Sequence, residues 1–174
     1  KELLCQAEEV RSDSTTLKII QENSIAPLPF EITLYQAVTK GKTMDLIIQK
    51  ATELGAHRVV PVLSERSVPD WDEAKAAAKV EKWRSVCIES IKQCGSAWLP
   101  TLEMPMTPSA AIEDARGAEV SLIATLQSDA KHPRTHIDGY EAENGQAPKK
   151  LAIWVGPEGD YTPAEINQIR GNAL

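Results

Sequence analysis

The chain has 174 residues, of which 42% are hydrophobic and 25% are charged, a balance that is ordinary for a soluble globular protein. No stretch approaches the roughly 18 consecutive apolar residues of a membrane-spanning helix, so we expect no membrane span. A formal net charge of −6 argues against binding nucleic acid through the overall field of the molecule, but it leaves room for a local basic groove.

The chain begins with strand-forming segments. Residues 3–10 and 15–21 are typical of two short strands joined by a polar turn. They look like the end of a β-rich unit, and the first residue is not Met, so we expect the chain to begin inside a longer or processed protein. Residues 23–29 contain two prolines and are interpreted as a linker.

A β-α-β unit is predicted next, over residues 31–63. Residues 31–38 form its first strand, a helix opens at Gly41 and ends at Gly55, and residues 58–63 form its second strand. Units of this kind pair their strands in parallel. The apolar face of the helix is predicted to consist of Met44, Ile47, Ile48, Ala51 and Leu54.

A long helix follows the β-α-β unit. Asp70 and Glu73 have the spacing of a capping box, and the helix is expected to end at Gln93 or Cys94, before Gly95. Its buried stripe is predicted to be Val80, Trp83, Cys87, Ile91 and Cys94.

The next segments alternate between strand and helix signals. Residues 99–104 predict a short strand, and Thr107 with Pro108 predicts a capped helix that runs through Ala115. Residues 120–126 are almost entirely apolar, which is typical of a strand covered on both faces. Residues 128–149 are polar and are interpreted as a long excursion.

The most informative segment comes last. An apolar strand over 151–155 stops at Gly156-Pro157-Glu158-Gly159, and Thr162, Pro163 and Glu165 then mark the start of a capped helix. In open α/β sheets, ligands bind where parallel strands end, so a cofactor pocket is expected here. On this segment alone, an ordinary strand-turn-helix junction remains the alternative.

The cysteines and histidines carry no metal-binding pattern. Cys5, Cys87 and Cys94 lack metal-like spacing, and the three histidines are dispersed, so we expect no metal. The cysteine usage favours a reducing, cytoplasmic location.

Four segments, taken in order, carry a family resemblance: 39–55 with Gln-Lys-Ala-Thr-Glu-Leu-Gly, 61–67 with Ser-Glu-Arg-Ser, 83–100 with Gln-Cys-Gly, and 155–159 with Val-Gly-Pro-Glu-Gly. Together they resemble the RsmE-type RNA methyltransferases of the SPOUT (trefoil-knotted) superfamily. The resemblance implies methylation of uracil N3 in 16S ribosomal RNA of the small ribosomal subunit, dependent on S-adenosylmethionine, by a homodimer. It also implies an α/β fold with a mainly parallel sheet flanked by helices.

The resemblance also suggests a domain organisation. Residues 1–24 would be the remnant of a PUA-like β domain that binds RNA, and residues 30–174 the SPOUT domain. Family members continue into a further segment that closes the cofactor pocket, whereas this sequence stops at Leu174. The knot segment is therefore expected to be missing from the chain as given.

Roles for individual residues follow from the same resemblance. Arg66 and Gln93 are the candidates for contact with the uracil, because a guanidinium donates a bidentate fork and an amide can pair with a base edge. Phosphates are expected to meet Lys40, Lys42, Arg66 and Lys92. Cofactor binding is assigned to Leu126, Gln127, Val155, Gly156, Pro157, Glu158 and Gly159.

Several of these side chains have structural alternatives. Arg66 would otherwise form a surface ion pair with Glu65 or Glu53, and Gln93 would simply end a helix. Glu158 would be a solvated carboxylate of the turn. Trp98 either stacks on a base or lies partly buried under Pro100.

Two departures from the family pattern keep a rival function open. Lys92 stands where the family usually has an acidic residue, and Ser96 where it usually has an arginine. A non-catalytic factor that binds ribosomal RNA or assists ribosome assembly fits these departures. An enzyme acting on transfer RNA is disfavoured by the 49–55 helix, and a nicotinamide-binding enzyme by the absence of G-x-G-x-x-G after a first strand.

Overall fold

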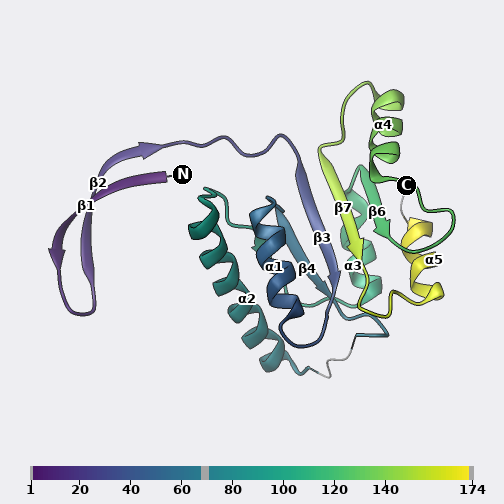
Figure 1. Ribbon diagram of the computed structural model, residues 1–174, viewed down its shortest axis with the longest axis horizontal. Coiled ribbons are helices and arrows are strands. Elements are labelled where there is room, and N and C mark those ends of the chain that lie inside the picture. The colour runs from purple at the N-terminus through teal and green to yellow at the C-terminus, as the bar shows by residue number, and fades with distance from the viewer. Residues whose placement is uncertain (1, 68–70, 173–174) are drawn as a thin grey trace.

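The body of the protein is built on a five-stranded parallel sheet. The computed structural model describes residues 2–67 and 71–172. The strand order is β5-β4-β3-β7-β6, and every neighbouring pair is parallel (Figure 1). The strands are β3 (Glu31–Ala37), β4 (Arg58–Val62), β5 (Thr101–Leu102), β6 (Val120–Ala124) and β7 (Lys150–Val155).

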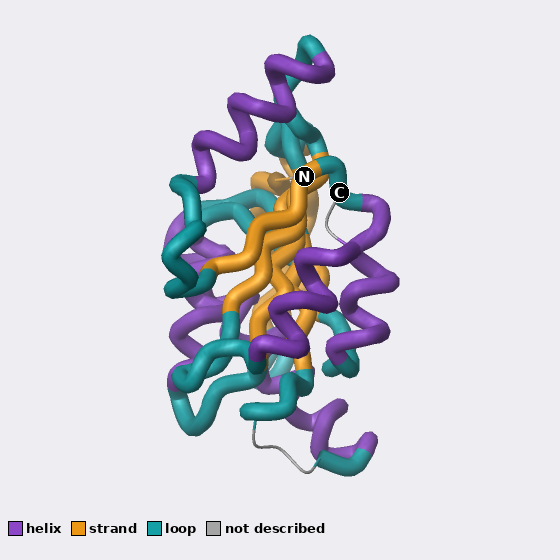
Figure 2. Tube along the Cα trace, turned by 90° about the vertical axis from the view of Figure 1, so that its right-hand side faces the viewer, coloured by secondary structure: helices purple, strands orange, loops and turns teal. Residues whose placement is uncertain are grey.

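Helices cover both faces of this sheet, as Figure 2 shows. One face is covered by α1 (Thr43–Glu53) and α2 (Glu73–Cys94). The other is covered by α3 (Pro108–Asp114), which continues into a 3₁₀ turn (Ala115–Gly117), and by α5 (Pro163–Asn172). The remaining helix, α4 (Pro133–Asn144), connects β6 to β7 and has no buried residue. The expected α/β architecture is confirmed.

The two faces bury separate apolar clusters. In β4, Val59 faces α1 and α2, whereas Val60 and Val62 face α3 and α5, as the two-residue period of a strand requires. On the α3 and α5 face, Tyr35 and Trp154 are register partners in β3 and β7. Their rings stack with centroids 4.2 Å apart, so they tie the central strands together.

A β-hairpin precedes the body. Strands β1 (Glu2–Val10) and β2 (Thr15–Asn23) pair in antiparallel fashion, which confirms the two predicted strands. Figure 1 shows the hairpin standing away from the sheet at the end of the extended segment 24–30. Its large apolar side chains Leu3, Leu4, Leu17, Ile19 and Ile20 are each half exposed or more.

The β-α-β unit and several helix ends were predicted correctly from local sequence signals. The β-α-β unit is confirmed, with α1 followed by Gly55 at a φ of +84°. Thr107 caps α3 by accepting a hydrogen bond from the amide of Ala110. Gly95 ends α2, as predicted, and it does so in the left-handed conformation.

The start of α2 and part of two apolar stripes were predicted wrongly. The N-cap of α2 is Asp72, whose carboxylate accepts from the Lys75 amide, while Asp70 lies outside the described residues. Leu54 is the C-cap of α1 and is 83% exposed, so it does not belong to the buried face of the helix. Cys94 is also exposed, and Ser90 is buried in the preceding turn instead.

The region from β6 to β7 also differs from the prediction. The strand β6 ends at Ala124 and only its first residue, Val120, is buried, so it is not fully covered on both faces, and Leu126 beyond it is 99% exposed. The polar excursion contains the 12-residue helix α4, which starts at Pro133. Its mostly exposed surface explains the lack of an apolar stripe in the sequence.

A charged network joins the strands to the end of α3. The Tyr35 hydroxyl donates to Asp114 at 2.7 Å, and the Arg58 guanidinium donates to Asp114 at 2.6 and 3.1 Å. Arg58 also donates to Glu103 at 2.8 Å. The Arg58 guanidinium, followed by the Tyr35 hydroxyl, holds the pKa of Asp114 below its usual value.

This network gives a pH-dependent prediction for Asp114→Asn. We expect the free energy of unfolding at neutral pH to fall by about 1–3 kcal/mol, because a charge-assisted pair is lost. Since the folded pKa of Asp114 lies below the unfolded one, its stabilisation is present above about pH 4 and disappears as the pH falls through the folded pKa. The variant should therefore lose less stability on acidification than the parent.

Urea unfolding between acidic and neutral pH checks this prediction. Asp138→Asn serves as the matched control, because Asp138 pairs with Arg134 on the exposed surface of α4 and such pairs contribute little. Identical pH profiles for Asp114→Asn and the parent would contradict the assigned role of the network.

Candidate functional site

The candidate site lies at the carboxyl edge of the sheet. Because the strands are parallel, the loops that follow β3, β4, β6 and β7 all emerge at this edge, at the lower end of the sheet in Figure 1. The amide of Val38 donates to the Val62 carbonyl at 2.9 Å. The buried side-chain amide of Gln36 donates to the backbone carbonyls of Ala37, Val155 and Gly156, so it joins the ends of β3 and β7.

The loop from β7 to α5 is a tight turn over residues 156–162. A Cβ atom on Gly156 would meet the Asp160 carboxylate at 2.9 Å and the Tyr161 amide nitrogen at 3.0 Å, so only glycine fits. Asp160 has a φ of +61°, and its carboxylate accepts from the Tyr161 amide at 2.7 Å. Gly159 is less constrained, because its Cβ would meet nothing closer than the Arg66 side chain at 3.7 Å.

Glu165 joins this loop to the loop after β4. Its carboxylate accepts from the Thr162 amide at 2.9 Å, and the Thr162 hydroxyl accepts from the Glu165 amide at 3.3 Å, so the predicted capping box is confirmed. The same carboxylate accepts from the Glu65 amide at 2.9 Å. Glu165 is only 6% exposed. Sequence reasoning identified the cap but missed the link to Glu65, which lies 100 residues away.

Arg66 reaches the same loop. Its guanidinium donates to the carbonyl oxygen of Gly159. Among the described residues, Arg66 forms no ion pair with Glu65 or Glu53, and Glu53 pairs with Lys50 at 2.8 Å instead. The surface ion pair considered for Arg66 is therefore not formed. Arg66 and the Gly156-to-Gly159 turn, separated by 90 residues in the sequence, meet in one place.

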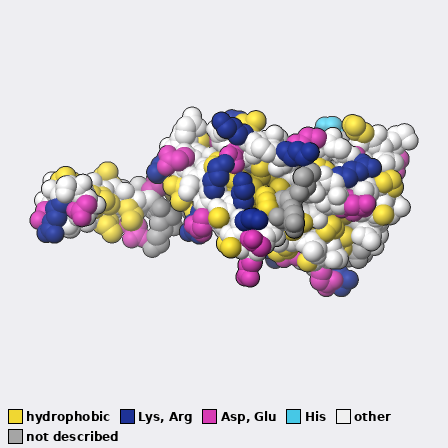
Figure 3. Space-filling model, turned by 90° about the horizontal axis from the view of Figure 1, so that it is seen from below, with side chains coloured by type: hydrophobic (Ala, Val, Ile, Leu, Met, Phe, Trp, Pro, Cys, Tyr) yellow, Lys and Arg dark blue, Asp and Glu magenta, His cyan; other side chains and the backbone are white. Residues whose placement is uncertain are grey.

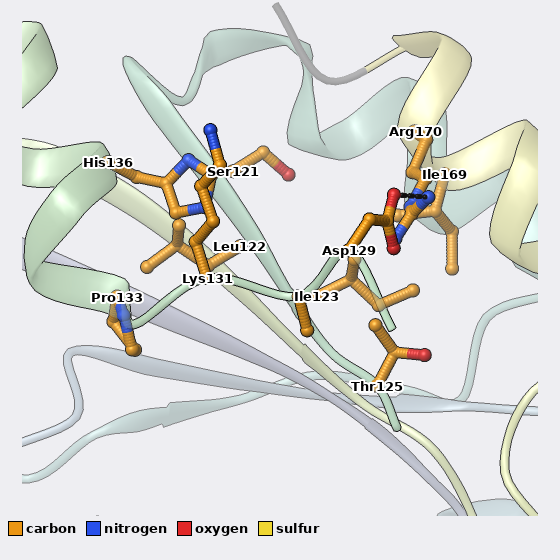
Figure 4. A pocket seen from close by; sticks show the side chains of 11 residues that line it. Ser121, Leu122, Ile123, Thr125, Asp129, Lys131, Pro133, His136, Ile169 and Arg170 are labelled. Atoms are coloured by element: carbon orange, nitrogen blue, oxygen red, sulfur yellow. Dashed lines mark hydrogen bonds and ion pairs between the residues drawn. The ribbon is translucent and has the colours of Figure 1, made fainter. Parts of the chain in front are cut away.

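A cavity of about 260 Å³ adjoins the end of β6. Figure 4 shows Asp129 paired with Arg170 of α5 on one side, and Lys131 and His136 on the side of α4. The hydroxyl of Thr125, which lines this cavity, is buried and has no hydrogen-bond partner among the described residues. Leu126 and Gln127 follow directly and are exposed, so they lie beside this cavity without lining it.

Basic side chains gather at the carboxyl edge. Figure 3, which looks onto this edge, shows several lysine and arginine side chains beside apolar ones. Lys40 and Lys42 come from the loop after β3 and are exposed. Lys79 of α2 lies with Lys40 around a common pocket. A local basic surface therefore exists although the net charge of the chain is −6.

Lys92 and Gln93 lie away from the candidate site, at the opposite edge of the sheet. Helix α2 starts near the carboxyl edge and returns along the sheet, so its last turn is at the opposite edge (Figure 1). Both side chains are exposed, and Lys92 pairs with Glu89 at 2.7 Å. Within one chain the structure thus separates Gln93 and Lys92 from Arg66. Trp98 is 46% exposed and lines a surface pocket together with Pro100, which agrees with the partly buried position considered from the sequence.

Metal and membrane features are not found in the described residues. No group of three or more histidine, cysteine, aspartate or glutamate side chains there is arranged to hold a metal ion. None of the helices in the described part of the chain is long and apolar enough to cross a membrane.

The fold and the site together define a parallel α/β domain with a turn that requires glycine and a cationic rim at one sheet edge. A family model described as an RNA methyltransferase domain matches residues 26–174. The chain belongs to this RNA methyltransferase domain family.

Individual relatives agree with this assignment. The chain is 28% identical over 171 residues to ribosomal RNA small subunit methyltransferase E of Bacillus subtilis, covering 97% of this chain and 66% of that protein. It is 29% identical over 168 residues to the protein of the same name in Aquifex aeolicus, covering 96% and 68%. The chain therefore spans about two thirds of the length of these curated relatives.

Solved structures also resemble this one. A Legionella pneumophila methyltransferase in complex with S-adenosylmethionine has a TM-score of 0.83 and 27% identity, covering 97% of this chain and 66% of that one. Ribosomal RNA small subunit methyltransferase E from Neisseria gonorrhoeae, bound to the same cofactor, has a TM-score of 0.78 and 25% identity, with the same coverage.

Proposed function

We propose that this chain is the cofactor-binding part of an enzyme that methylates uracil N3 in small-subunit 16S ribosomal RNA, using S-adenosylmethionine. The observation that carries the proposal is the turn at Gly156, which accepts a hydrogen bond from Arg66 and lies at the same sheet edge as the loop that holds Lys40 and Lys42. Similarity to a relative named for methylation of the small ribosomal subunit and to structures that hold S-adenosylmethionine supports it.

The residues present fit S-adenosylmethionine. Backbone groups of the turn from Val155 through Gly156, Pro157, Glu158 and Gly159 are proposed to hold the adenosine, because Gly156 allows the turn to close tightly on Asp160 and Tyr161 and so fixes the direction of these groups. Leu126 and Gln127 would form another wall after β6. The buried Thr125 hydroxyl, which lacks a partner among the described residues, suits a polar group of a ligand at this strand end.

The chemistry assigns a role to Arg66. S-adenosylmethionine supplies a methyl group carried on a positively charged sulfur. Uracil N3 carries a proton that must leave, and negative charge then spreads onto the ring oxygens. The Arg66 guanidinium, held at the edge by the Gly159 carbonyl, is proposed to stabilise that charge with its remaining donors.

Arg66→Ala tests this role. We expect the rate of RNA methylation to fall roughly 100-fold, as when one donor to a developing negative charge is removed. The dissociation constant for S-adenosylmethionine should rise less than about tenfold, because only one exposed hydrogen bond to the loop is lost. Calorimetric titration and single-turnover methylation give the two values. Equal losses in both measurements would contradict direct contact with the uracil.

A homodimer is also proposed, and α2 supports it. This helix has 22 residues and is therefore about 33 Å long. Gln93, at its end, cannot reach a uracil held beside Arg66 of the same chain. If Gln93 and Lys92 contact the bound RNA near the uracil that Arg66 holds, they must belong to a second copy of this chain.

The remaining assignments are proposals that rest on the family resemblance. Residues 1–24 are proposed to belong to a PUA-like β domain, and the separate position of the β1–β2 hairpin supports a boundary near residue 24. Residues 30–174 are proposed to form a trefoil-knotted SPOUT domain. The three cysteines are free, which is consistent with action in the cytoplasm.

The decisive experiment offers S-adenosylmethionine and this chain to small ribosomal subunits that lack the modification. We expect nucleoside mass spectrometry to reveal N3-methyluridine at one site. A folded protein that binds the subunit without methylating it would favour the alternative function of a non-catalytic assembly factor, which Lys92 and Ser96 support.

A further inference from the structure

A second pocket opens at the end of β3, between α1 and α2, and the cofactor assignment does not use it. Its volume is about 300 Å³. The side chains that matter for its chemistry are Thr39, Lys40, Asp45, Trp71, Lys79 and Trp83. They come from three separate segments of the chain.

One wall of this pocket is aromatic. Trp83 is 3% exposed, and its indole N–H donates to Asp45 at 3.0 Å, so its ring is held in place. Trp71 is only partly buried, and its ring meets that of Trp83 at 5.8 Å between centroids, tilted by 54°. The fixed Trp83 thus supports Trp71, which presents aromatic surface to the pocket.

Two lysines, Lys40 and Lys79, and the hydroxyl of Thr39 also line the pocket. Among the described residues, neither Lys40 nor Lys79 forms an ion pair, and the Lys79 ammonium lies 6.0 Å from the Trp71 ring. The hydroxyl of Thr39 is buried without a hydrogen-bond partner in the described part of the chain. A buried hydroxyl without a partner is unfavourable, so a ligand that supplies one stabilises the site.

The pocket also stands in the right place for a substrate. Strand β3 is the sheet neighbour of β7, and Gln36 hydrogen-bonds across to Val155 and Gly156 at the ends of these strands. Neighbouring strands are only about 4.8 Å apart. The pocket and the loop assigned to the cofactor therefore follow neighbouring strands and lie at the same edge of the sheet.

From this arrangement we propose that the pocket binds an unpaired nucleotide of the RNA substrate, adjacent to the uridine that is methylated. Its base stacks on Trp71, its phosphate lies between Lys40 and Lys79, and the Thr39 hydroxyl pairs with a polar atom of the base or ribose. Aromatic surface beside lysines is how proteins hold single-stranded nucleic acid. The proposal rests on the proposed function for the identity of the RNA.

The test measures binding of a short single-stranded oligouridylate by tryptophan fluorescence, together with binding of S-adenosylmethionine by calorimetry. Trp71→Ala should weaken oligouridylate binding roughly 5- to 100-fold, the usual effect of losing one stacked base, whereas Trp71→Phe should stay near the parent. In a plot of the logarithm of the association constant against the logarithm of salt concentration, Lys79→Gln should reduce the steepness of the slope by about 0.7. This is the value for one phosphate contact on a single strand. None of these variants should change the affinity for S-adenosylmethionine.

Lys50→Gln is the matched control, because Lys50 is an exposed lysine at the far end of α1, paired with Glu53. Oligouridylate binding that is equal in Trp71→Ala, Lys79→Gln and the parent overturns the pocket, and so does a parent that does not bind oligouridylate. If the parent methylates ribosomal subunits and these variants bind oligouridylate and methylate subunits as the parent does, the pocket assignment is wrong but the proposed function is unaffected. If the parent transfers no methyl group but Trp71→Ala loses oligouridylate binding, the pocket stands and the proposed enzyme activity fails.

Discussion

Gly156→Ala is expected to lower the affinity for S-adenosylmethionine about 10- to 100-fold, and Gly156→Val to abolish binding. The new Cβ would lie 2.9 Å from the Asp160 carboxylate, 3.0 Å from the Tyr161 amide nitrogen and 3.2 Å from the Asp160 carbonyl carbon. Two of these atoms belong to the backbone, so the turn itself must move. Overpacking of this kind costs about 1–3 kcal/mol, and here the strain falls on the loop assigned to the cofactor.

Gly159→Ala provides the comparison within the same turn. Its Cβ would meet only the Arg66 side chain at 3.7 Å, an ordinary contact, and its φ is not in the left-handed region. We expect calorimetric titration to give near-parental affinity for Gly159→Ala, with thermal unfolding showing that both variants fold. Normal cofactor affinity in Gly156→Val would remove the basis for placing the cofactor at this turn.

Glu165→Ala is expected to lower the free energy of unfolding by about 3 kcal/mol or more. The carboxylate receives hydrogen bonds from the Thr162 amide, the Thr162 hydroxyl and the Glu65 amide in a site where Glu165 is 6% exposed. Each buried donor left without a partner costs about 1–3 kcal/mol. Because whole domains are stable by only about 5–15 kcal/mol, this is a large fraction of the total.

Urea unfolding measures this effect, and Glu158→Ala is its control. Glu158 is an exposed carboxylate in the neighbouring turn, so its removal should change stability by less than about 0.5 kcal/mol. Glu165→Ala should also weaken S-adenosylmethionine binding, because the loops after β4 and β7 are no longer joined. A variant with parental stability would show that the link between Glu65 and Glu165 is dispensable.

Much of the fold was predictable because its signals are local. The Thr162, Pro163 and Glu165 cap acts within one helical turn, and the apolar period of 44–51 places α1 on the sheet. The parallel pairing of β3 with β4 follows from the intervening helix. These features depend on neighbours in the sequence, so the sequence alone indicates them.

The errors have a common physical origin. Asp70 and Asp72 are both competent caps, and only the path of the chain selects Asp72. Leu54 and Leu126 continue apolar patterns in the sequence, but the elements that carry them end where no partner covers the side chain. Helix α4 was missed because a helix without a buried face has no apolar period.

The sequence by itself determined the α/β class, the order of most elements, the glycine turn at 156–159 and the family. The class, the element order and the turn depend on short-range periodicity and capping, and the family was indicated by the resemblance of four short segments. The tertiary structure alone decided which distant groups meet: Glu165 with Glu65, Arg66 with Gly159, and Trp71 with Trp83. It also separated Gln93 from Arg66. Strand order and the direction of α2 set these distances, and no local pattern in the sequence encodes them.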